Sequence, residues 1–409
     1  MDPAENPNAQ RLIWSNGLQN IGDQIVAAKT VLPWLLHVGG APSFLLALLV
    51  PIRESGSMLP QAAITGWVLS QKSRVRVWVI GSIGQFLSAL GIGIAALSLQ
   101  GWALGLVVIA LLATLSLCRA LCSISSKDVQ GATISKGHRG EITGRATMIG
   151  GVFGLLTGAA LAFIVGENAA VWVLGGVVIF SSFSWLIAAI IFNKIEAPEP
   201  TAKASKDAGE NWLRRCVDTL IRDKDFRRFV VVRSMMLVTS LSTAFIVALA
   251  AEAGSNIGAL GFFLIASGLA SIVGGRISGM WSDRSSKNVM AVGALSASLI
   301  LIAVVACSYW VSSTINMWIF PLAFFLVNIA HTAVRVARKT YVLDMAEGDQ
   351  RTRYVADANT LMGVILLLVG ALSGALSTLG NDIALLFLTF IGLIGVVCAK
   401  SLKEVSQKS

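Results

Sequence analysis

Long apolar runs separated by short polar interruptions follow one another along the chain. A hydrocarbon layer about 30 Å thick needs roughly 20 apolar residues per helical span. The runs have that length and are continuous rather than alternating, which favours helices over the strands of a β-barrel. We therefore expect about twelve membrane-spanning helices. Their predicted bounds are 12–37, 42–69, 77–98, 102–127, 144–166, 169–193, 228–250, 256–279, 288–310, 316–339, 355–378 and 383–399.

A polar segment at 194–226 divides these spans into two sets of six. The sequence therefore predicts an N-terminal bundle at 1–193, a cytoplasmic linker at 194–226 and a C-terminal bundle at 227–409. The linker begins with a stretch rich in Pro, Ala and Lys, and apolar residues then recur with helical spacing from Trp212 to Leu220. Two interpretations stay open for this second part, an amphipathic helix on the membrane surface and a disordered connector.

Composition supports a membrane protein, because 55% of the 409 residues are hydrophobic and only 13% are charged. The net charge of +10 does not indicate a nucleic-acid partner, since Lys and Arg gather in the loops predicted on one side. That distribution follows the positive-inside rule and places both termini in the cytoplasm. The first ten residues lack the basic region of a cleavable signal, so we expect the first span to be retained.

The two halves repeat weakly around a glycine-containing turn. Gly66 in GWVLSQKSR and Gly279 in GMWSDRSSK are separated by the same interval as Arg74 and Lys287. Matches at one interval and at equivalent places in the topology favour a duplicated six-helix unit. Such internal duplication is common in secondary transporters, where the binding site lies between the repeats.

This organisation resembles the major facilitator superfamily over nearly the whole chain. The family's signature turn, Gly-x-x-x-Asp-Arg-x-x-Lys, is matched in the second half and degenerate in the first, where Ser70 occupies the acidic position. The blocks RESGSMLPQ, SSKDVQG and RKTYVLD also resemble a branch of uncharacterised proteobacterial permeases. The resemblance implies two pseudo-symmetric six-helix bundles and gating turns on the cytoplasmic side. The predicted gating residues are Gly66, Arg74, Gly279, Asp283, Arg284 and Lys287.

Polar residues form stripes in the first, fourth and tenth spans, and the resemblance implies that spans one, four, seven and ten line a central cavity. Charges inside a membrane are costly and need a partner or a water-filled cavity. The first span carries Asn16, Asn20 and Asp23, and the fourth carries Arg119, Ser123 and Ser126. The tenth carries Asn328, His331, Arg335 and Arg338.

Asp23 and Arg119 lie at similar depths below the cytoplasmic side, and we predict that they form an ion pair. A substrate that competes for the arginine would allow the acid to take up a proton, so the pair could couple transport to protons. The alternative is a permanent pair that joins two helices. His331 could relay protons or only bond across helices. Arg335 and Arg338 could favour an anionic or zwitterionic solute, or simply mark a cytoplasmic helix end.

The stretch VPIRESGSMLPQ places Arg53 beside Glu54 between two prolines. Successive helical residues point about 100° apart, so these two side chains must face different surroundings. Glu54 is a second candidate for protonation, with Lys29 as its candidate partner. Arg53 is a candidate anion contact or a tie between helices. Pro51 and Pro60 predict a bend, and a purely structural hinge remains the alternative.

Catalysis is not expected, because the sequence contains no Walker A loop, no H-E-x-x-H and no G-x-S-x-G. We predict no cofactor and no metal, and interpret Cys118 and Cys122 as packing residues. The expected function is proton-coupled, alternating-access transport of a small organic solute across the bacterial inner membrane by a monomer, with export as the direction. The alternatives are proton-linked uptake of an organic anion, and a lipid flippase or a membrane protein that transports nothing.

Overall fold

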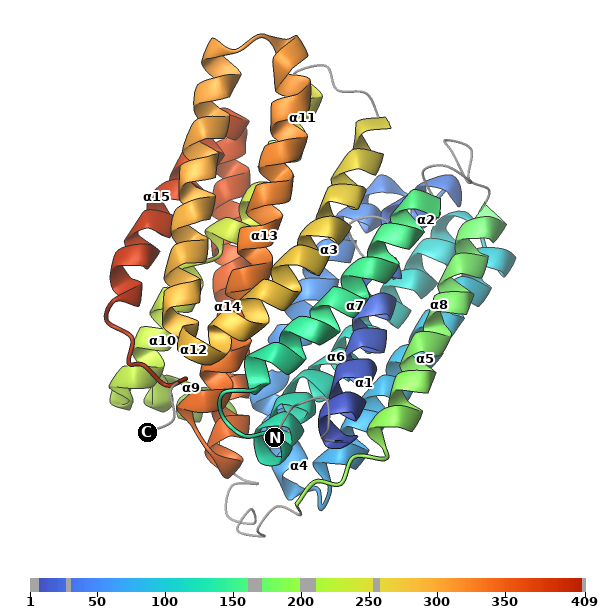
Figure 1. Cartoon of the computed structure of the whole chain (residues 1–409). Coiled ribbons are helices and arrows are strands. Elements are labelled where there is room, and N and C mark those ends of the chain that lie inside the picture. The colour runs from blue at the N-terminus through green and yellow to red at the C-terminus, as the bar shows by residue number, and fades with distance from the viewer. Residues whose placement is uncertain (1–6, 27–30, 161–170, 199–210, 253–257, 407–409) are drawn as a thin grey trace. The chain divides into compact units, whose positions relative to one another are not determined.

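The computed structural model describes residues 7–26, 31–160, 171–198, 211–252 and 258–406, and within them the secondary structure is α-helical without strands (Figure 1). Most predicted spans correspond to one helix, with ends that differ by a few residues. The helices are α1 (Pro7–Ile25), α2 (Val31–Val38), α3 (Ser43–Met58), α4 (Gln61–Ser70), α5 (Arg74–Ser98), α6 (Gly101–Thr133), α7 (Arg139–Ala160), α8 (Val171–Phe192), α9 (Trp212–Arg222), α10 (Lys224–Met235), α11 (Val238–Glu252), α12 (Gly258–Trp310), α13 (Ser313–Met345), α14 (Gly348–Ser377) and α15 (Asn381–Ala399).

Besides the span at 12–37, which is represented by α1 and α2, two predicted spans are divided at breaks within the described residues. Proline has no backbone N–H and interrupts the hydrogen-bond ladder of a helix. As the prolines predicted, the 42–69 run bends, because α3 ends at Met58 and α4 begins after Pro60. A second break, between α10 and α11, falls at Met236–Leu237. It carries neither Gly nor Pro and was not predicted.

The long helix α12 contains a turn. Ser285 has non-helical dihedral angles, with φ −161° and ψ 94°, and separates the two predicted spans at 256–279 and 288–310. Among the described residues, eight helical segments are long and apolar enough to cross a membrane. Large apolar side chains such as Trp172 and Phe180 on α8 are exposed. Such exposure is unfavourable in water and is satisfied by lipid.

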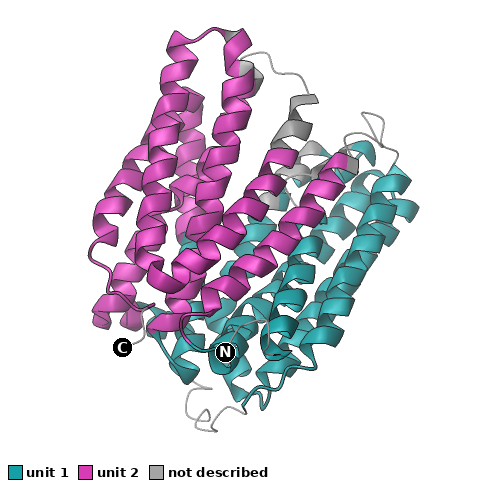
Figure 2. Cartoon of the chain, viewed as in Figure 1, with its two compact units in different colours: residues 1–135, 163–217, 346–364 teal, residues 136–162, 218–345, 365–409 magenta. Residues whose placement is uncertain are grey.

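The chain divides into two compact units (Figure 2). Unit 1 consists of residues 1–135, 163–217 and 346–364, and unit 2 of residues 136–162, 218–345 and 365–409. The units do not coincide with the predicted sequence halves, because α7 falls in unit 2 and the first part of α14 in unit 1. The predicted division into two duplicated halves, residues 1–193 and 227–409, therefore stays a prediction that rests on the sequence.

Close packing of α5 against α8 forms much of the core of unit 1. Trp78 stacks on Phe192 with ring centroids 3.9 Å apart, and the hydroxyl of Ser82 donates to the carbonyl of Trp185 at 2.7 Å. A Cβ atom added at Gly93 would lie 2.9 Å from the carbonyl oxygen of Gly175. Glycine therefore permits the two backbones to approach closely at this level.

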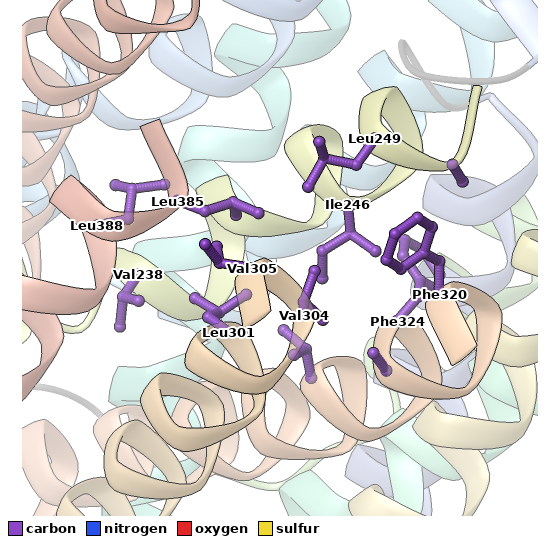
Figure 3. Close-up of a cluster of buried hydrophobic side chains, with 13 residues drawn as sticks. Val238, Ile246, Leu249, Leu301, Val304, Val305, Phe320, Phe324, Leu385 and Leu388 are labelled. Atoms are coloured by element: carbon purple, nitrogen blue, oxygen red, sulfur yellow. The ribbon is translucent and has the colours of Figure 1, made fainter. Parts of the chain in front are cut away.

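Aliphatic and aromatic side chains from α11, the second arm of α12, α13 and α15 form a core in unit 2 (Figure 3). Val238 and Ile246 of α11 pack here, with Leu301 of α12, Phe320 of α13 and Leu388 of α15 among their neighbours. All five are fully or almost fully buried. The core packs α11, the part of α12 after Ser285, α13 and α15 against one another.

Glycines from α7 and α12 face one another in antiparallel register within unit 2. Gly140 lies opposite Gly279, Gly144 opposite Gly275, and Gly151 opposite Gly268. A Cβ atom at Gly140 would be 2.5 Å from the carbonyl oxygen of Gly279, and one at Gly151 would be 3.0 Å from that of Gly268. The small residues allow direct contact between the backbones, as is common between membrane helices.

Candidate functional site

Three helices of unit 1 bring one acid and two bases together. Asp23 lies on α1, Arg53 on α3 and Arg119 on α6. One carboxylate oxygen of Asp23 accepts from Arg53 at 2.5 Å, and the other pairs with Arg119 at 2.7 Å. We call these three residues the Asp23 cluster. Its side chains are 19%, 11% and 21% exposed, in that order, so each remains partly accessible.

The Asp23 cluster carries one more positive than negative charge. Each guanidinium contacts a different carboxylate oxygen, which makes the clamp charge-assisted at both ends. A guanidinium offers five N–H donors in a rigid fork and suits bidentate binding of carboxylate or phosphate. The arrangement can therefore hold an anion if Asp23 gives up one of its two arginines. The structure brings together Asp23 and Arg119, as predicted, and adds Arg53 to them.

Further polar side chains join the same helices. The side chain of Asn16 on α1 accepts from the hydroxyl of Ser126 on α6 at 2.9 Å, and its amide donates to its own helix at Leu12. Asn20 and Ser123 are partly buried on the same two helices. These contacts fix the orientation of α1 relative to α6 near the Asp23 cluster.

The predicted pairing of Glu54 with Lys29 falls outside the described residues, because Lys29 is not among them. Glu54 itself is partly buried, and its backbone carbonyl accepts from Ser57 at 2.9 Å. Arg53 points instead to α1. This contact agrees with the expectation that Arg53 and Glu54, as neighbours on a helix, face different surroundings.

Sequence reasoning missed the polar group around Cys122. The amide of Gln85 on α5 donates to the Cys122 sulfur at 3.2 Å, and Cys122 in turn donates to the carbonyl of Trp78 at 3.3 Å. Gln85 and Cys122 are both fully buried. The sequence feature that could have indicated this group is Gln85, a polar residue within the apolar run 77–98. Within the described part of the chain, no His, Cys, Asp and Glu gather in a set of three that could hold a metal.

The first-half turn finds its acids elsewhere in unit 1. Ser70 replaces the acid of the signature turn, and its hydroxyl donates to the carbonyl of Trp67 and accepts from the side chain of Gln71. The buried Arg74 pairs instead with Asp128 on α6 at 3.1 Å and with Asp349 on α14 at 3.5 Å. The sequence could not reveal these partners, because both are remote along the chain.

The second-half turn holds the beginning of α7. The two carboxylate oxygens of Asp283 accept from the backbone N–H groups of Gly140 and Glu141 at 2.6 and 2.8 Å. The first N–H groups of a helix have no intrahelical partner and carry a partial positive charge, so a carboxylate stabilises them. Arg284 is exposed and Lys287 is partly buried. Asp283 and Gly279 are members of the signature turn with described contacts to α7.

Residues near this turn make further ties within unit 2. Arg139, the first residue of α7, pairs with the buried Asp344 of α13 at 2.8 Å. The C-terminal segment also contacts the turn, since the hydroxyl of Ser285 donates to Glu404 at 2.5 Å and Ser406 bonds to Ser286 at 2.8 Å. The sequence carried no signal for this attachment of the tail.

The polar stripe of the tenth span lies on α13 in unit 2. The Nδ1 atom of His331 is 3.1 Å from the hydroxyl of Thr239 on α11. Asn328 donates to the carbonyl of Phe324 in its own helix at 2.9 Å. Arg335 and Arg338 are partly buried. His331 therefore makes a contact between helices, and its predicted proton relay stays a prediction.

Helix α9 is fixed to unit 1 by a buried ion pair. Arg215 donates to Asp357 of α14 at 3.3 Å and to the carbonyl of Ala62 at 3.0 Å. The neighbouring Cys216 is buried beside Asp357. The second part of the linker is therefore a helix rather than a disordered connector. Its apolar residues do not all face the same way, because Cys216 is buried whereas Leu213 and Val217 are exposed.

We expect Cys216 to react slowly with thiol reagents, and its labelling rate to keep rising with pH up to pH ~10. Burial raises the pKa of Cys216 to about 12, with the nearby Asp357 adding to the rise and Arg215 opposing it. Because the thiolate is the reactive form, the rate should increase about tenfold per pH unit. Maleimide labelling followed by mass spectrometry, in a variant with the other four cysteines replaced by Ala, measures the rate.

The matched control is Leu213→Cys with Cys216 also replaced, which places the thiol on the exposed side of α9. Its labelling rate should level off near the ordinary thiol pKa of about 8.5. A rate at Cys216 that levels off at the same pH would contradict the burial described above.

No protein-family model matches the sequence, and no curated protein matches it. Solved structures do match. The E. coli fucose:proton symporter FucP shares 12% identity, covers 98% of both chains and has a TM-score of 0.71. The proton:xylose symporter XylE, of the major facilitator superfamily, shares 12% identity over 98% of this chain and 97% of its own, with a TM-score of 0.71. The human organic anion transporter MFSD10 shares 12% identity over 97% of this chain and 100% of its own, with a TM-score of 0.72. The chain therefore has the major facilitator fold of a multi-pass membrane protein.

Proposed function

We propose that this chain is a proton-coupled secondary transporter that moves a small organic anion across the bacterial inner membrane. The observation that carries the proposal is the Asp23 cluster, in which one partly accessible carboxylate holds two arginines from different helices. An ion pair inside a membrane protein marks a functional site by default. The fold supports transport because the similar structures include two proton symporters and an organic anion transporter.

The mechanism follows from competition for the arginines. A substrate carboxylate binds Arg53 or Arg119 in place of one oxygen of Asp23. Asp23 then loses part of its countercharge in a medium of low dielectric, and taking up a proton removes the cost of its charge. Release of the substrate on the other side restores the clamp and expels the proton. Residues 1–193 and 227–409 rock about the site to expose it to each side in turn.

Because the anion and the proton cross together in this mechanism, export, the direction we propose first, runs down an outward gradient of the substrate. Proton-linked uptake of an organic anion, driven by the inward proton gradient, is the second candidate. The surplus positive charge of the Asp23 cluster favours an anionic substrate in either case. The excess of Lys and Arg in the loops of one side supports an orientation with both termini in the cytoplasm. We propose a monomer, since each chain contains the complete cluster.

The test is a thermal-shift screen of the purified protein against small carboxylic acids, siderophores and antibiotics, followed by flux measurements in proteoliposomes. A ligand raises apparent stability by mass action, and the best binders are then supplied under an imposed pH gradient. We expect a binding anion to be transported and to change the internal pH, reported by a trapped dye. Accumulation in everted vesicles identifies export, and accumulation in right-side-out vesicles identifies uptake.

Two outcomes would overturn the proposal. A binding anion that crosses the vesicle membrane no faster than in protein-free vesicles would exclude its transport. Movement of fluorescent phospholipids between leaflets, with no flux of water-soluble anions, would establish a flippase instead. Loss of the pH effect with retained anion flux would exclude proton coupling only.

A further inference from the structure

Helix α9 has two faces with opposite surroundings. Arg215 and Cys216 are 7% and 2% exposed and dock on unit 1. Leu213, Val217 and Ile221 are 56%, 42% and 62% exposed. These three residues follow at intervals of four and therefore form one stripe along the helix. We call Leu213, Val217 and Ile221 the apolar stripe of α9.

The apolar stripe lies outside every segment that is long and apolar enough to cross a membrane. In water, such a row of large aliphatic side chains would cost free energy in proportion to its area. The ion pair of Arg215 with Asp357 and its bond to Ala62 hold the opposite face, so the stripe is not turned inward. Its exposure is therefore a fixed property of the docked helix and requires a partner.

The position of α9 in the chain places it beside the membrane. A single residue, Asp223, separates α9 from α10, and the candidate span Lys224–Ala250 begins directly afterwards. Asp223 has an extended backbone, with φ −92° and ψ 107°, and caps α10 by accepting from Asp225 and Phe226. Because the helix is broken there, α9 does not continue along the axis of α10. α9 therefore ends one residue short of the candidate span.

Charge identifies the partner that fits. Arg214 and Arg222 are both exposed. At about 100° per residue, Arg214 borders the apolar stripe next to Ile221, whereas Arg222 lies about 140° from Val217 at the end of the helix, with the half-buried Asp218 between the two arginines. A helix with an apolar face and flanking basic residues lies in the interfacial plane of a membrane, where the apolar side chains enter the acyl boundary. Each basic residue near a surface of anionic lipid contributes about 1 kcal/mol. A water-exposed protein partner would not explain why the helix is placed at the start of a span.

We propose that α9 is a surface anchor that inserts its apolar stripe into the membrane interface and binds anionic phospholipid headgroups through Arg214 and Arg222. The occupant is the lipid of the membrane that the protein spans. Docking through Arg215 then fixes the beginning of α4 and the first part of α14 relative to the membrane surface. This inference concerns the resting protein and does not depend on which solute, if any, is transported.

Depth-dependent quenching tests the proposal in the full-length protein. Single cysteines are introduced as Leu213→Cys, Val217→Cys or Asp218→Cys in a background without native cysteines, and labelled with a fluorophore. The protein is placed in nanodiscs of phosphatidylcholine, with or without phosphatidylglycerol, that contain a phospholipid with a quencher near its headgroup. We expect several-fold stronger quenching at 213 and 217 than at 218, the matched polar position. Quenching at 213 should increase when phosphatidylglycerol is present.

A second variant, Arg214→Gln with Arg222→Gln, isolates the headgroup contribution. Loss of each arginine should lower the affinity of α9 for membranes that contain phosphatidylglycerol roughly fivefold. Equal quenching at 213, 217 and 218 in both membranes, with an unchanged melting temperature, would overturn the anchor. Strong quenching at 213 that ignores phosphatidylglycerol would overturn the assignment of anionic headgroups.

Discussion

Asp23→Asn is expected to abolish proton-driven accumulation of the substrate while leaving exchange of substrate across the membrane. Asparagine resembles the protonated acid, since it is neutral and cannot clamp two guanidinium groups by charge. Arg53 and Arg119 then remain available to an anion at every pH. Binding no longer requires uptake of a proton, so a pH gradient cannot drive it. Counterflow of labelled substrate and dye-reported proton flux in the same proteoliposomes measure the two activities separately.

Asp23→Glu is the control, because it keeps the acid and should retain part of the proton-driven transport. If Asp23→Asn accumulates substrate with the full pH dependence, coupling does not occur at this residue. A purely structural clamp predicts a different result. The variant would then lose exchange, accumulation and thermal stability together, since removal of one partner leaves two arginines without their acid. The two interpretations are therefore separated by whether exchange survives.

Much of the fold could be predicted, because a bilayer allows few solutions for an apolar run. Helices α5, α6, α8 and α15 begin and end within a few residues of predicted spans, apart from the C-terminal extension of α6 to Thr133. The bend before α4 was predictable because Pro60 interrupts the hydrogen-bond ladder. The break at Met236–Leu237 was not, since neither residue disfavours a helix.

The Asp23 cluster shows what sequence can and cannot supply about a site. Equal depth in the membrane predicted that Asp23 and Arg119 would meet, because depth follows from counting residues along a helix. For Arg53 the sequence left two roles open, an anion contact or a tie between helices, and it did not predict Asp23 as its partner. Whether two helices are neighbours depends on packing, which a single sequence does not specify. The acids of Arg74 were missed for the same reason, since Asp349 is remote in the chain.

Gly144→Ala is expected to cause the largest loss of stability among single methyl additions along the contact of α7 with α12. A Cβ atom there would lie well inside the van der Waals contact distance from the Gly275 carbonyl oxygen, and that backbone atom cannot move aside as a side chain could. The two helices must separate, with loss of the neighbouring contacts at Gly140 and Gly151. Overpacking of this kind costs about 3 kcal/mol. Thermal unfolding of the purified protein should show a fall of several degrees.

Gly176→Ala is the matched control for this loss of stability. Gly176 also lies within a long helix, α8, but a Cβ atom added there meets nothing within 4 Å. Alanine is favoured over glycine in a helix by about 1 kcal/mol, so this variant should melt at the same temperature or slightly higher. Equal melting temperatures for Gly144→Ala and Gly176→Ala would show that α7 and α12 are not in backbone contact. A fall confined to Gly144→Ala would instead support the close backbone contact between α7 and α12. That contact keeps the second-half turn next to the beginning of α7, where Asp283 accepts from Gly140 and Glu141.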